Sequence, residues 1–465
     1  MYHRNSQLLA IVDAIKAAGG RALIVGGYVR DHLLNLNPKD IDVEVYGLTL
    51  EQLRSTLAKF GDVDMVGKAF GVFKLHGCDI SIPRRDNKVA AGHKGFEISF
   101  DPFMSLEDAA RRRDFTMNSM AMDPITEQII DPFGGQRHLD DGVLVMTDPK
   151  TFVEDPLRVL RGAQFIARYE LSPNVSLLNT SREIAQTMKE LAAERVWEEM
   201  CKLLLKGKKP SQGFEFLRDA GVLPVLFPEL QALIGCQQEY EWHPEGDVWI
   251  HTLMAVDVAA ELFRTGDLNH DLTVMFGALC HDLGKPATTQ FETGRWRAKG
   301  HEEAGIAPTT AFMDRMRAPL ELTKAVCGLV AVHLAPAHFA NPKFNATPKA
   351  YRNLARKLDA AGTTIDMLFK VSSSDHFGRT TPDAIARDFA IGEKFMEKAK
   401  EIKIVDKPEP DIVMGRHLIA RGMKPGKEFG PILDKCREYQ YETGCKDHET
   451  ILRVVLNEPT ENVVV

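Results

Sequence analysis

Hydrophobic and polar residues follow different patterns in the front and rear parts of this chain. Up to about residue 150, helical stretches such as residues 50–60 alternate with short apolar runs typical of strands, at residues 21–27, 41–47 and 71–83. From residue 155 onward, apolar side chains recur at helical spacing almost to the end of the chain. The pattern therefore predicts an α+β fold, with a mixed β-sheet and helices in front and all-helical parts behind.

Clusters of proline, glycine and charged residues divide the helical part. They occur at residues 206–211, 237–245 and 403–411. We therefore expect four domains, which are a head, a helical neck, a third helical domain and a helical tail. Their expected bounds are 1–150, 151–236, 237–395 and 396–465.

Composition narrows the class of protein. The 465 residues suffice for about three domains, and the 44% hydrophobic and 26% charged fractions are ordinary for a soluble globular protein. No uninterrupted apolar run approaches the ~20 residues that span a bilayer, so we expect no membrane segment. The seven cysteines show no paired spacing, which favours a reducing, cytoplasmic compartment. With a net charge of −7, any contact with nucleic acid depends on local basic patches.

A glycine pair and two aspartates follow the first strand candidate. Gly26 and Gly27 carry no side chain, so a nucleoside triphosphate can approach their backbone amides, with Arg30 near the phosphates. In a strand, Asp40 and Asp42 point to the same face and present two carboxylates, hard oxygen ligands that suit magnesium. Each half alone is more often a glycine turn or a charged surface strand, but the combination at this spacing favours a nucleotide and metal site.

Two further groups carry charges suited to the same chemistry. Asp79, in a later strand candidate, can supply the third carboxylate of a two-metal site, although alone it indicates only a charge on an edge strand. In the arginine run that ends at Arg113, guanidinium groups match phosphate and ribose oxygens, and Asp114 can accept a hydrogen bond from a ribose hydroxyl. The alternative for this pair is a basic helix N-terminus with Asp114 as its counterion.

Asp155 and Arg158 lie three residues apart in an amphipathic helix candidate, with Arg161 one turn further on. A carboxylate and a guanidinium side by side offer acceptors and donors to the edge of a base. A protein helix can therefore select a nucleotide without a nucleic-acid template. An intrahelical surface salt bridge is the commoner meaning of this spacing taken alone.

The rear part carries histidines and aspartates spread over several helix candidates. A helical bundle uses such dispersed residues to build a metal site, and an adjacent His–Asp pair followed by LGK is the most diagnostic feature among them. The residues are His251, His281, Asp282, His301, His333 and Asp375.

Taken together, these motifs resemble a known family. They resemble the class II tRNA nucleotidyltransferases, the CCA-adding enzymes, over residues 22–205 and in the family's order, through GGYVRD, DID, RRDFTMNSMAMD, DPFGG, EDPLRVLR and ERVWEE. The rear block resembles the HD domain that some bacterial members carry, through HPEGDVWIHTLMAVD, ALCHDLGKP and GHEEAG.

The resemblance implies roles for the front residues. Asp40, Asp42 and Asp79 match the catalytic carboxylates that bind magnesium, although the family often has Glu at the position of Asp79. Glu194 and Arg195 match a motif that braces the nucleotide-selecting helix. The matched nucleotide-binding positions are Gly26, Gly27 and Arg30 for the triphosphate, Arg113 and Asp114 for the ribose, Asp155, Arg158 and Arg161 as the amino-acid template, and Asn118, which is followed by Ser119 where the family usually has Ala.

The resemblance also implies a second metal centre. It matches four rear residues to the metal ligands of the HD domain, and similar enzymes use that site for phosphatase or phosphodiesterase activity. We expect a divalent transition metal there. The four residues are His251, His281, Asp282 and Asp375.

The implied reaction is template-independent addition of CCA to the tRNA 3′ end. The tRNA 3′ hydroxyl attacks the α-phosphate of CTP twice and of ATP once, and pyrophosphate leaves. The segment 87–105 has glycines and few periodic signals, which predicts an exposed flexible loop, and its rearrangement is expected to accompany the change from C to A. The expected partners are tRNA, ATP and CTP, with no obligate protein partner.

Other functions share parts of this pattern. Bacterial poly(A) polymerases share the head motifs, and a specialist that adds only CC or only A fits them too. From another class, the chain could act as an HD phosphohydrolase with an RNA-binding front, although the intact Asp40 and Asp42 argue against this. A non-catalytic RNA-binding protein is favoured only if both acidic sites are incomplete.

Overall fold

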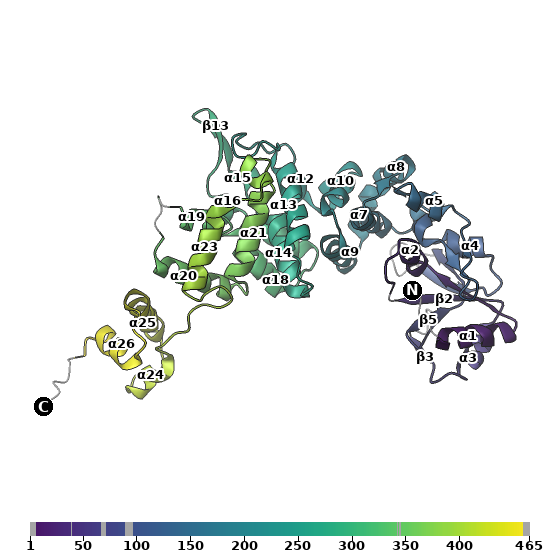
Figure 1. Cartoon of the computed structure of the whole chain (residues 1–465), viewed down its shortest axis with the longest axis horizontal. Helices are drawn as coiled ribbons and strands as arrows, with labels where there is room; N and C mark the ends of the chain where they lie inside the picture. The colour runs from purple at the N-terminus through teal and green to yellow at the C-terminus, as the bar shows by residue number, and fades with distance from the viewer. Residues whose placement is uncertain are drawn as a thin grey trace. The chain divides into compact units, whose positions relative to one another are not determined.

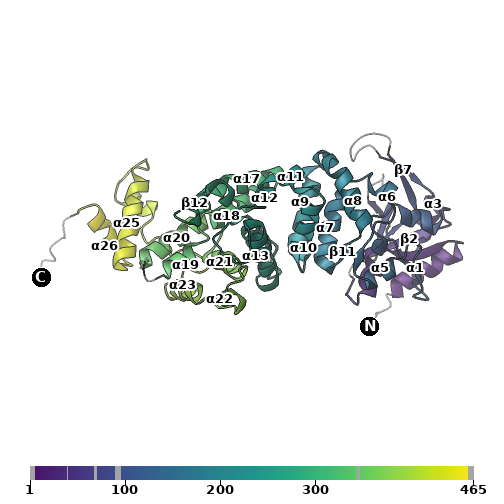
Figure 2. The same ribbon diagram turned by 90° about the horizontal axis from the view of Figure 1, so that it is seen from above.

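The computed structural model describes residues 6–38, 40–66, 71–88, 96–341, 343 and 346–458. The chain divides into two compact units, residues 1–231 and residues 232–465. Figures 1 and 2 show strands with surrounding helices in the front of the chain and mainly helices in the rest. The predicted α+β class, with a mixed sheet in the head and helices behind, is confirmed.

The first unit is built on a seven-stranded sheet. Its strands are β1 (Arg21–Val25), β2 (Ile41–Tyr46), β3 (Asp64–Val66), β4 (Val72–Leu75), β5 (Cys78–Ser81), β8 (Ala121–Met122) and β9 (Ile129–Ile130). They lie in the order β3-β4-β5-β2-β1-β8-β9. β2 pairs antiparallel with β1 and parallel with β5, in a register that places Asp42 opposite Asp79. Strand pairing therefore brings together carboxylates that are far apart in the sequence.

Local sequence explains where the elements around β1 and β2 begin and end. Four of the five β1 residues are buried, and the strand ends before Gly26, whose φ of 73° leaves the extended region. Helix α2 (Gly27–Leu33) follows directly. The helix expected at residues 50–60 is α3 (Leu50–Leu57), which begins with a capping box formed by Thr49 and Gln52.

The prediction of a loop throughout residues 87–105 is wrong. Strand β6 (Arg84–Lys88) pairs antiparallel with β7 (Phe96–Phe100), and helix α4 (Leu106–Arg111) begins at the Ser105 cap. The signal for β7 is the alternation of apolar and polar residues in FEISF. The glycines just before it favoured a loop prediction instead. Residues 89–95 of this segment lie outside the described residues.

Helices make up the rest of the first unit. After short α5 (Gly135–Asp140) and α6 (Pro149–Phe152) come α7 (Leu157–Tyr169), α8 (Val175–Ile184), α9 (Ala193–Lys206), α10 (Pro210–Asp219), α11 (Leu223–Leu226) and α12 (Pro228–Gln231). Helix α7 packs against both α9 and α10. A Cβ at Gly213 of α10 would lie 2.6 Å from the carbonyl oxygen of Ala163, so α7 and α10 approach more closely than alanine permits. This packing holds the helix that carries Arg158 and Arg161.

In the part of the second unit that the structure describes, all regular elements are helices apart from one hairpin. Its main helices are α13 (Val248–Leu262), α14 (Leu268–Cys280), α16 (His301–Ala304), α17 (Ile306–Arg315), α18 (Leu320–Val330), α19 (Ala335–Phe339), α20 (Pro348–Ala360), α21 (Ile365–Phe377) and α23 (Ala390–Glu401). The hairpin pairs β12 (Thr289–Glu292) with β13 (Arg295–Ala298). Helices α24 (Gly415–Ala420), α25 (Phe429–Thr443) and α26 (His448–Val455) share a separate small core around Leu418 and Leu452.

One segment of the described chain, Leu320–Phe339, is long and apolar enough to cross a membrane by length and composition alone. Of its most apolar stretch, 56% is buried within the protein. Such burial is what a core helix of a soluble fold also shows, so the segment is weak evidence for a membrane span.

Candidate functional sites

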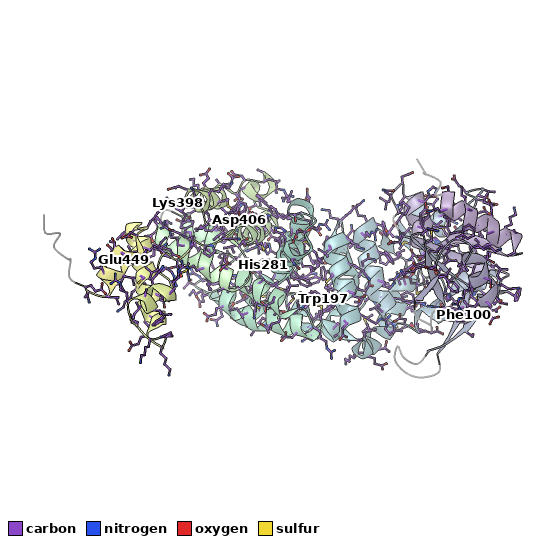
Figure 3. The ribbon with its side chains drawn as sticks, turned by 90° about the horizontal axis from the view of Figure 1, so that it is seen from below. Phe100, Trp197, His281, Lys398, Asp406 and Glu449 are labelled. Carbon is purple, nitrogen blue, oxygen red and sulfur yellow. The ribbon has the colours of Figure 1, made fainter. Side chains whose placement is uncertain are left out.

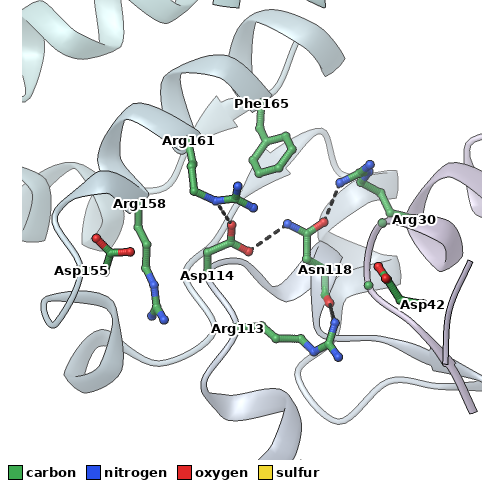
Figure 4. A pocket seen from close by; sticks show the side chains of 11 residues that line it. Arg30, Asp42, Arg113, Asp114, Asn118, Asp155, Arg158, Arg161 and Phe165 are labelled. Carbon is green, nitrogen blue, oxygen red and sulfur yellow. Dashed lines mark hydrogen bonds and ion pairs between the residues drawn. The ribbon is translucent and has the colours of Figure 1, made fainter. Parts of the chain in front are cut away.

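A pocket of about 360 Å³ in the first unit collects the predicted nucleotide-binding residues. Figure 4 shows their side chains converging on it from α2, β2, α7 and the segment before β8. Every nucleotide-binding residue predicted from the sequence lines the pocket, as does Asp42, and Phe165 is the one lining residue that was not predicted. The lining residues are Gly26, Gly27, Arg30, Asp42, Arg113, Asp114, Asn118, Asp155, Arg158, Arg161 and Phe165.

The glycine turn and two arginines form one wall of this pocket. A Cβ at Gly26 would lie 2.8 Å from Nη1 of Arg113, so a side chain there would displace the guanidinium. Arg30 is buried, donates from Nη1 to Oδ1 of Asn118 at 2.7 Å, and stacks over Phe165 with its guanidinium carbon 5.3 Å from the ring centre. This wall thus sets the glycine turn beside two guanidinium groups, of which that of Arg30 also pairs with Asp31 at 2.7 Å.

Of the three predicted catalytic carboxylates, Asp42 lines the pocket, whereas Asp40 and Asp79 do not. Asp42 lies opposite Asp79 across the β2–β5 pair, and Asp40 precedes β2. Burial raises the pKa of Asp42, and the charges of Asp79 and Asp40 raise it further, while Arg113 opposes them. Mutual repulsion among carboxylates is relieved by a cation, and oxygen donors suit hard divalent metals. The chemistry of these residues suits a metal, but they are not among the groups of described residues whose ligand atoms lie within 4.8 Å of one another, and Asp79 pairs with Lys74 at 3.1 Å.

Asp114 lies at the centre of a hydrogen-bonded network. Its carboxylate accepts from Nε of Arg161 at 2.7 Å, from Nδ2 of Asn118 at 2.9 Å and from the backbone N–H of Phe115 at 2.8 Å. Burial favours its neutral form, but Arg161 and these hydrogen bonds hold the pKa of Asp114 below its usual value. The network joins α7 to the segment before β8, and through Asn118 it reaches Arg30 of α2.

Asp155 and Arg158 line the same pocket, but each is bonded to a different partner. Arg158 donates to the carbonyl oxygens of Thr151 at 2.9 Å and Arg112 at 2.6 Å. Asp155 accepts from Arg195 of α9 at 2.7 Å. The structure thus lacks the intrahelical salt bridge that the spacing suggested. It places Arg195 against Asp155, two residues before the helix that the resemblance expects the Glu194 and Arg195 motif to brace.

Two residues at this site, Phe165 and Glu44, were not predicted from the sequence. Phe165 lies four residues after Arg161, and this helical spacing was the available signal. Glu44 is buried two residues after Asp42, and its carboxylate lies 3.3 Å from Arg112 and 3.7 Å from Arg113. Alternation along β2 could have indicated Glu44, because it points to the same face as Asp42.

A second cluster lies in the second unit, where Figure 3 shows His281 among the helices. Three groups of three side chains each place their ligand atoms within 4.8 Å of one another, and one of them, His243, Glu245 and His251, shares His251 with another. The other two groups form the core of the cluster. The first of these is His251, His281 and Asp375, and the second is Asp282, His301 and His333. All six residues are buried. The structure thus unites the four predicted ligands with His301 and His333, which the sequence analysis noted without assigning them as ligands.

Asp282 lies between the two groups. Its Oδ2 is 3.1 Å from Nε2 of His281, and its Oδ1 is 3.4 Å from Nε2 of His301. Both carboxylate oxygens are buried without a hydrogen bond, although the ammonium of Lys285 is 2.7 Å from Oδ2. Burial opposes ionisation, but His281 and Lys285 hold the pKa of Asp282 well below its usual range. A buried carboxylate between imidazoles fits a metal ligand.

Backbone contacts orient the imidazoles for metal binding. Nδ1 of His281, His301 and His333 each lies 2.8 Å from the carbonyl oxygen three residues earlier. Nδ1 therefore carries the proton in the neutral ring, and the lone pair of Nε2 is available to a metal. His251 is held differently, because its Nδ1 lies 2.8 Å from Oε1 of Glu245, a residue that the sequence analysis did not identify.

Comparison with known proteins agrees with this division into sites. Residues 22–145 match the Poly A polymerase head domain, residues 176–234 match the probable RNA and SrmB-binding site of polymerase A, and residues 248–361 match the HD domain. The multifunctional CCA protein of Neisseria gonorrhoeae is 40% identical over 312 residues, which cover 65% of this chain and 72% of the relative. That of Stenotrophomonas maltophilia is 40% identical over 315 residues, covering 65% and 74%.

Solved structures share the fold across nearly the whole chain. The CCA-adding enzyme of Bacillus stearothermophilus in complex with CTP matches with a TM-score of 0.67 and 21% identity, covering 98% of both chains. The Thermotoga maritima CCA-adding enzyme complexed with tRNA matches with a TM-score of 0.58 and 19% identity, covering 97% of this chain and 94% of the other. At these identities the likeness to the solved structures establishes the fold alone.

Proposed function

This chain belongs to the multifunctional CCA protein family of tRNA nucleotidyltransferases, and we propose that its head adds CCA to the tRNA 3′ end from CTP and ATP. The observation that carries the proposal is the head pocket. It holds the glycine turn, the carboxylate Asp42 and the pair Asp155 and Arg158 around one cavity of about 360 Å³. A triphosphate, a reacting phosphorus and a base can therefore be bound by the same pocket.

The triphosphate lies against the glycine wall in this proposal. Gly26, Gly27 and Arg113 line the pocket, so phosphate oxygens can approach the backbone of the turn and the guanidinium of Arg113. Arg30 adds positive charge, and because Asn118 and Phe165 hold its side chain, little conformational entropy is lost on binding.

Asp40, Asp42 and Asp79 would hold magnesium at the edge of this pocket. Bound magnesium supplies charge neutralisation at the triphosphate and favours the ionised form of the attacking hydroxyl. The tRNA 3′ oxygen forms a bond to the α-phosphorus, the bond to the β-phosphate oxygen breaks, pyrophosphate leaves and the hydroxyl proton passes to solvent. The residues of the chain bind and orient the two reactants, which is the main source of rate in this chemistry.

Base selection is assigned to Asp155 and Arg158. Both face the pocket, and each is held by a partner outside it: Arg195 for Asp155, and backbone carbonyls for Arg158. Their remaining acceptors and donors can pair with the edge of cytosine or adenine. The bonds between Arg161, Asp114 and Asn118 fix α7 relative to the nucleotide.

Incorporation assays with the nucleotides supplied separately test the proposal. A tRNA that lacks its last three nucleotides is incubated with magnesium and labelled CTP alone, labelled ATP alone, or both. We expect two additions with CTP alone, none with ATP alone, and label from both nucleotides when they are combined. Addition of repeated A residues from ATP alone would instead identify a poly(A) polymerase.

The buried cluster in the second unit supports a second activity, hydrolysis of phosphate esters. His251, His281 and Asp375 can hold one divalent metal, and Asp282, His301 and His333 a second. Imidazole ligands favour a transition metal over magnesium. Lys285 and Arg379 place positive charge beside Asp282 and Asp375, where a phosphate would lie. Metal analysis of the purified chain tests this, with two metals per chain expected and one or none contradicting it.

A further inference from the structure

A short turn beside the second metal cluster exposes two aromatic side chains. Tyr240 is 76% exposed and Trp242 is 56% exposed. His243 follows immediately, and its ring packs edge-on against His251 with centres 4.6 Å apart. Its Nδ1 is also 2.9 Å from Oε1 of Glu245, the carboxylate that holds His251. The aromatic turn is therefore connected through one residue to a candidate metal ligand.

Hydrogen bonds fix this turn from several sides. The backbone N–H groups of Trp242 and His243 donate to the carbonyl oxygen of Glu239 at 3.1 and 3.0 Å. The side chain of Glu239 accepts from the backbone N–H of Trp296 in β13 at 3.0 Å. On the other side, Lys285 donates to Gln238 at 2.6 Å and also contacts Asp282. The two exposed aromatic rings therefore lie on a turn whose backbone is fixed by hydrogen bonds.

The neighbouring strand adds positive charge. Arg295, Arg297 and Lys299 alternate along β13 and just beyond it, so they share the exposed face of the hairpin. Arg295 pairs with Glu241 of the turn at 2.9 Å, and Lys299 pairs with Glu292 at 2.6 Å. These ion pairs are exposed and cost little to open. Figure 1 shows the hairpin projecting beyond α15 (Lys285–Thr288).

We propose that Tyr240 and Trp242 form a stacking platform for the unpaired bases of an RNA 3′ end whose terminal phosphate lies at the HD metal cluster. Aromatic rings next to a line of basic side chains are the combination that binds single-stranded nucleic acid without sequence preference, because every base has a face that can stack. The metal cluster with Lys285 and Arg379 accounts for the phosphate. The inference rests on the proposed hydrolytic function and names its substrate class.

Binding of short oligonucleotides by the full-length protein tests the platform. The probes are two unpaired hexaribonucleotides of one sequence, one ending in a 3′-phosphate and one in a 3′-hydroxyl, so the difference in their affinities reports on the phosphate site. Tyr240→Ala with Trp242→Ala should weaken binding of the 3′-phosphate probe at least tenfold. Tyr240→Phe with Trp242→Phe keeps the stacking faces and should bind within twofold of the wild type.

A matched control replaces two other exposed apolar residues of the same unit, Leu320→Ala with Ile385→Ala, which are 64% and 70% exposed. This control should bind both probes as the wild type does, and all variants should retain CCA addition. The platform is contradicted if the double alanine variant binds the 3′-phosphate probe as tightly as the wild type.

Crosslinking locates the terminal base. With 4-thiouridine as the last base of the 3′-phosphate probe, label is expected in the peptide that contains residues 239–243, and label confined to other peptides would contradict the platform. Hydrolysis of the same probe is scored separately. If the proposed hydrolysis is wrong, the probe crosslinks to the turn but no phosphate is released. If the platform is wrong, the Tyr240→Ala, Trp242→Ala variant releases phosphate as the wild type does.

Discussion

At the scale of single residues, the charged side chains around the head pocket are held by partners on other elements. Asp155 is bonded to Arg195, Arg158 to backbone carbonyls, and Asp114 to Arg161. Helical spacing predicted that Asp155, Arg158 and Arg161 lie along one helix face. It could not predict the pairing, because a long guanidinium reaches carbonyls and carboxylates that the sequence places dozens of residues away.

Replacing Arg161 tests the most buried of these ion pairs. In Arg161→Met, the carboxylate of Asp114 keeps two hydrogen bonds but loses its cation. We expect a loss of about 1–3 kcal/mol in the free energy of unfolding, below the value for fully buried pairs because the Arg161 side chain is 35% exposed. The pKa of Asp114 is lowered in the folded state, so the stabilisation is present above about pH 4 and disappears as the pH falls through the folded value.

Urea unfolding of the wild type and the Arg161→Met variant at several pH values measures this difference. The gap between the two proteins should be largest near pH 7 and shrink on acidification. A gap that stays constant down to pH 2.5 would mean that the ion pair does not stabilise the fold.

Glu245 offers a test of positioning in the second cluster. In Glu245→Gln, the imidazole of His251 loses a carboxylate partner for its Nδ1, so its orientation and basicity change. Metal affinity measured by titration of the metal-free protein should fall about 10–100-fold. The exposed Glu321→Gln serves as control, and Glu245→Asp should recover part of the affinity. Unchanged affinity in Glu245→Gln would assign the residue a purely structural role.

At the scale of elements, close helix packing and strand register place the candidate catalytic groups. The β2–β5 pairing sets Asp42 opposite Asp79, and glycine lets α10 approach α7. Alternation and helical periodicity predicted most of these elements. The β6–β7 hairpin escaped because glycines masked the alternation in FEISF, and His301 and His333 were left unassigned because sequence spacing does not tell which helix ends meet.

Two glycine substitutions test the packing of α7 on α10. Gly213→Ala places a Cβ 2.6 Å from the carbonyl oxygen of Ala163, so the helices must separate. We expect the free energy of unfolding to fall by about 1–3 kcal/mol. Nucleotide binding should also weaken, because α7 carries Arg158 and Arg161. Gly430→Ala in α25 meets no atom within 4 Å and should leave stability unchanged or raise it slightly. Thermal unfolding of both variants decides, and equal melting temperatures would contradict the packing argument.

At the scale of the whole molecule, each of the two units carries one centre. The head pocket lies in residues 1–231 and the histidine cluster in residues 232–465. The front motifs predicted nearly all of the pocket because the residues lie in short, locally ordered segments. The four domain bounds of 1–150, 151–236, 237–395 and 396–465 remain our proposal, since contacts within the described chain resolve two units.

Paired variants test the independence of the two centres. Asp40→Ala with Asp42→Ala should abolish nucleotide incorporation and leave phosphate release unchanged, because these carboxylates belong to the head. His281→Ala with Asp282→Ala should do the reverse. Both activities are measured on each protein alongside its unfolding transition. If either pair removed both activities in a folded chain, the two-centre account would be wrong.

The central claim is that the head completes the tRNA 3′ end and then stops. Intact mass measurement of a tRNA lacking its last three nucleotides, after incubation with excess CTP, ATP and magnesium, tests this most directly. The account predicts a single final product heavier by two C and one A, and no incorporation by the Asp40→Ala, Asp42→Ala variant. A product that stops at two C, or that keeps growing with A, would contradict it.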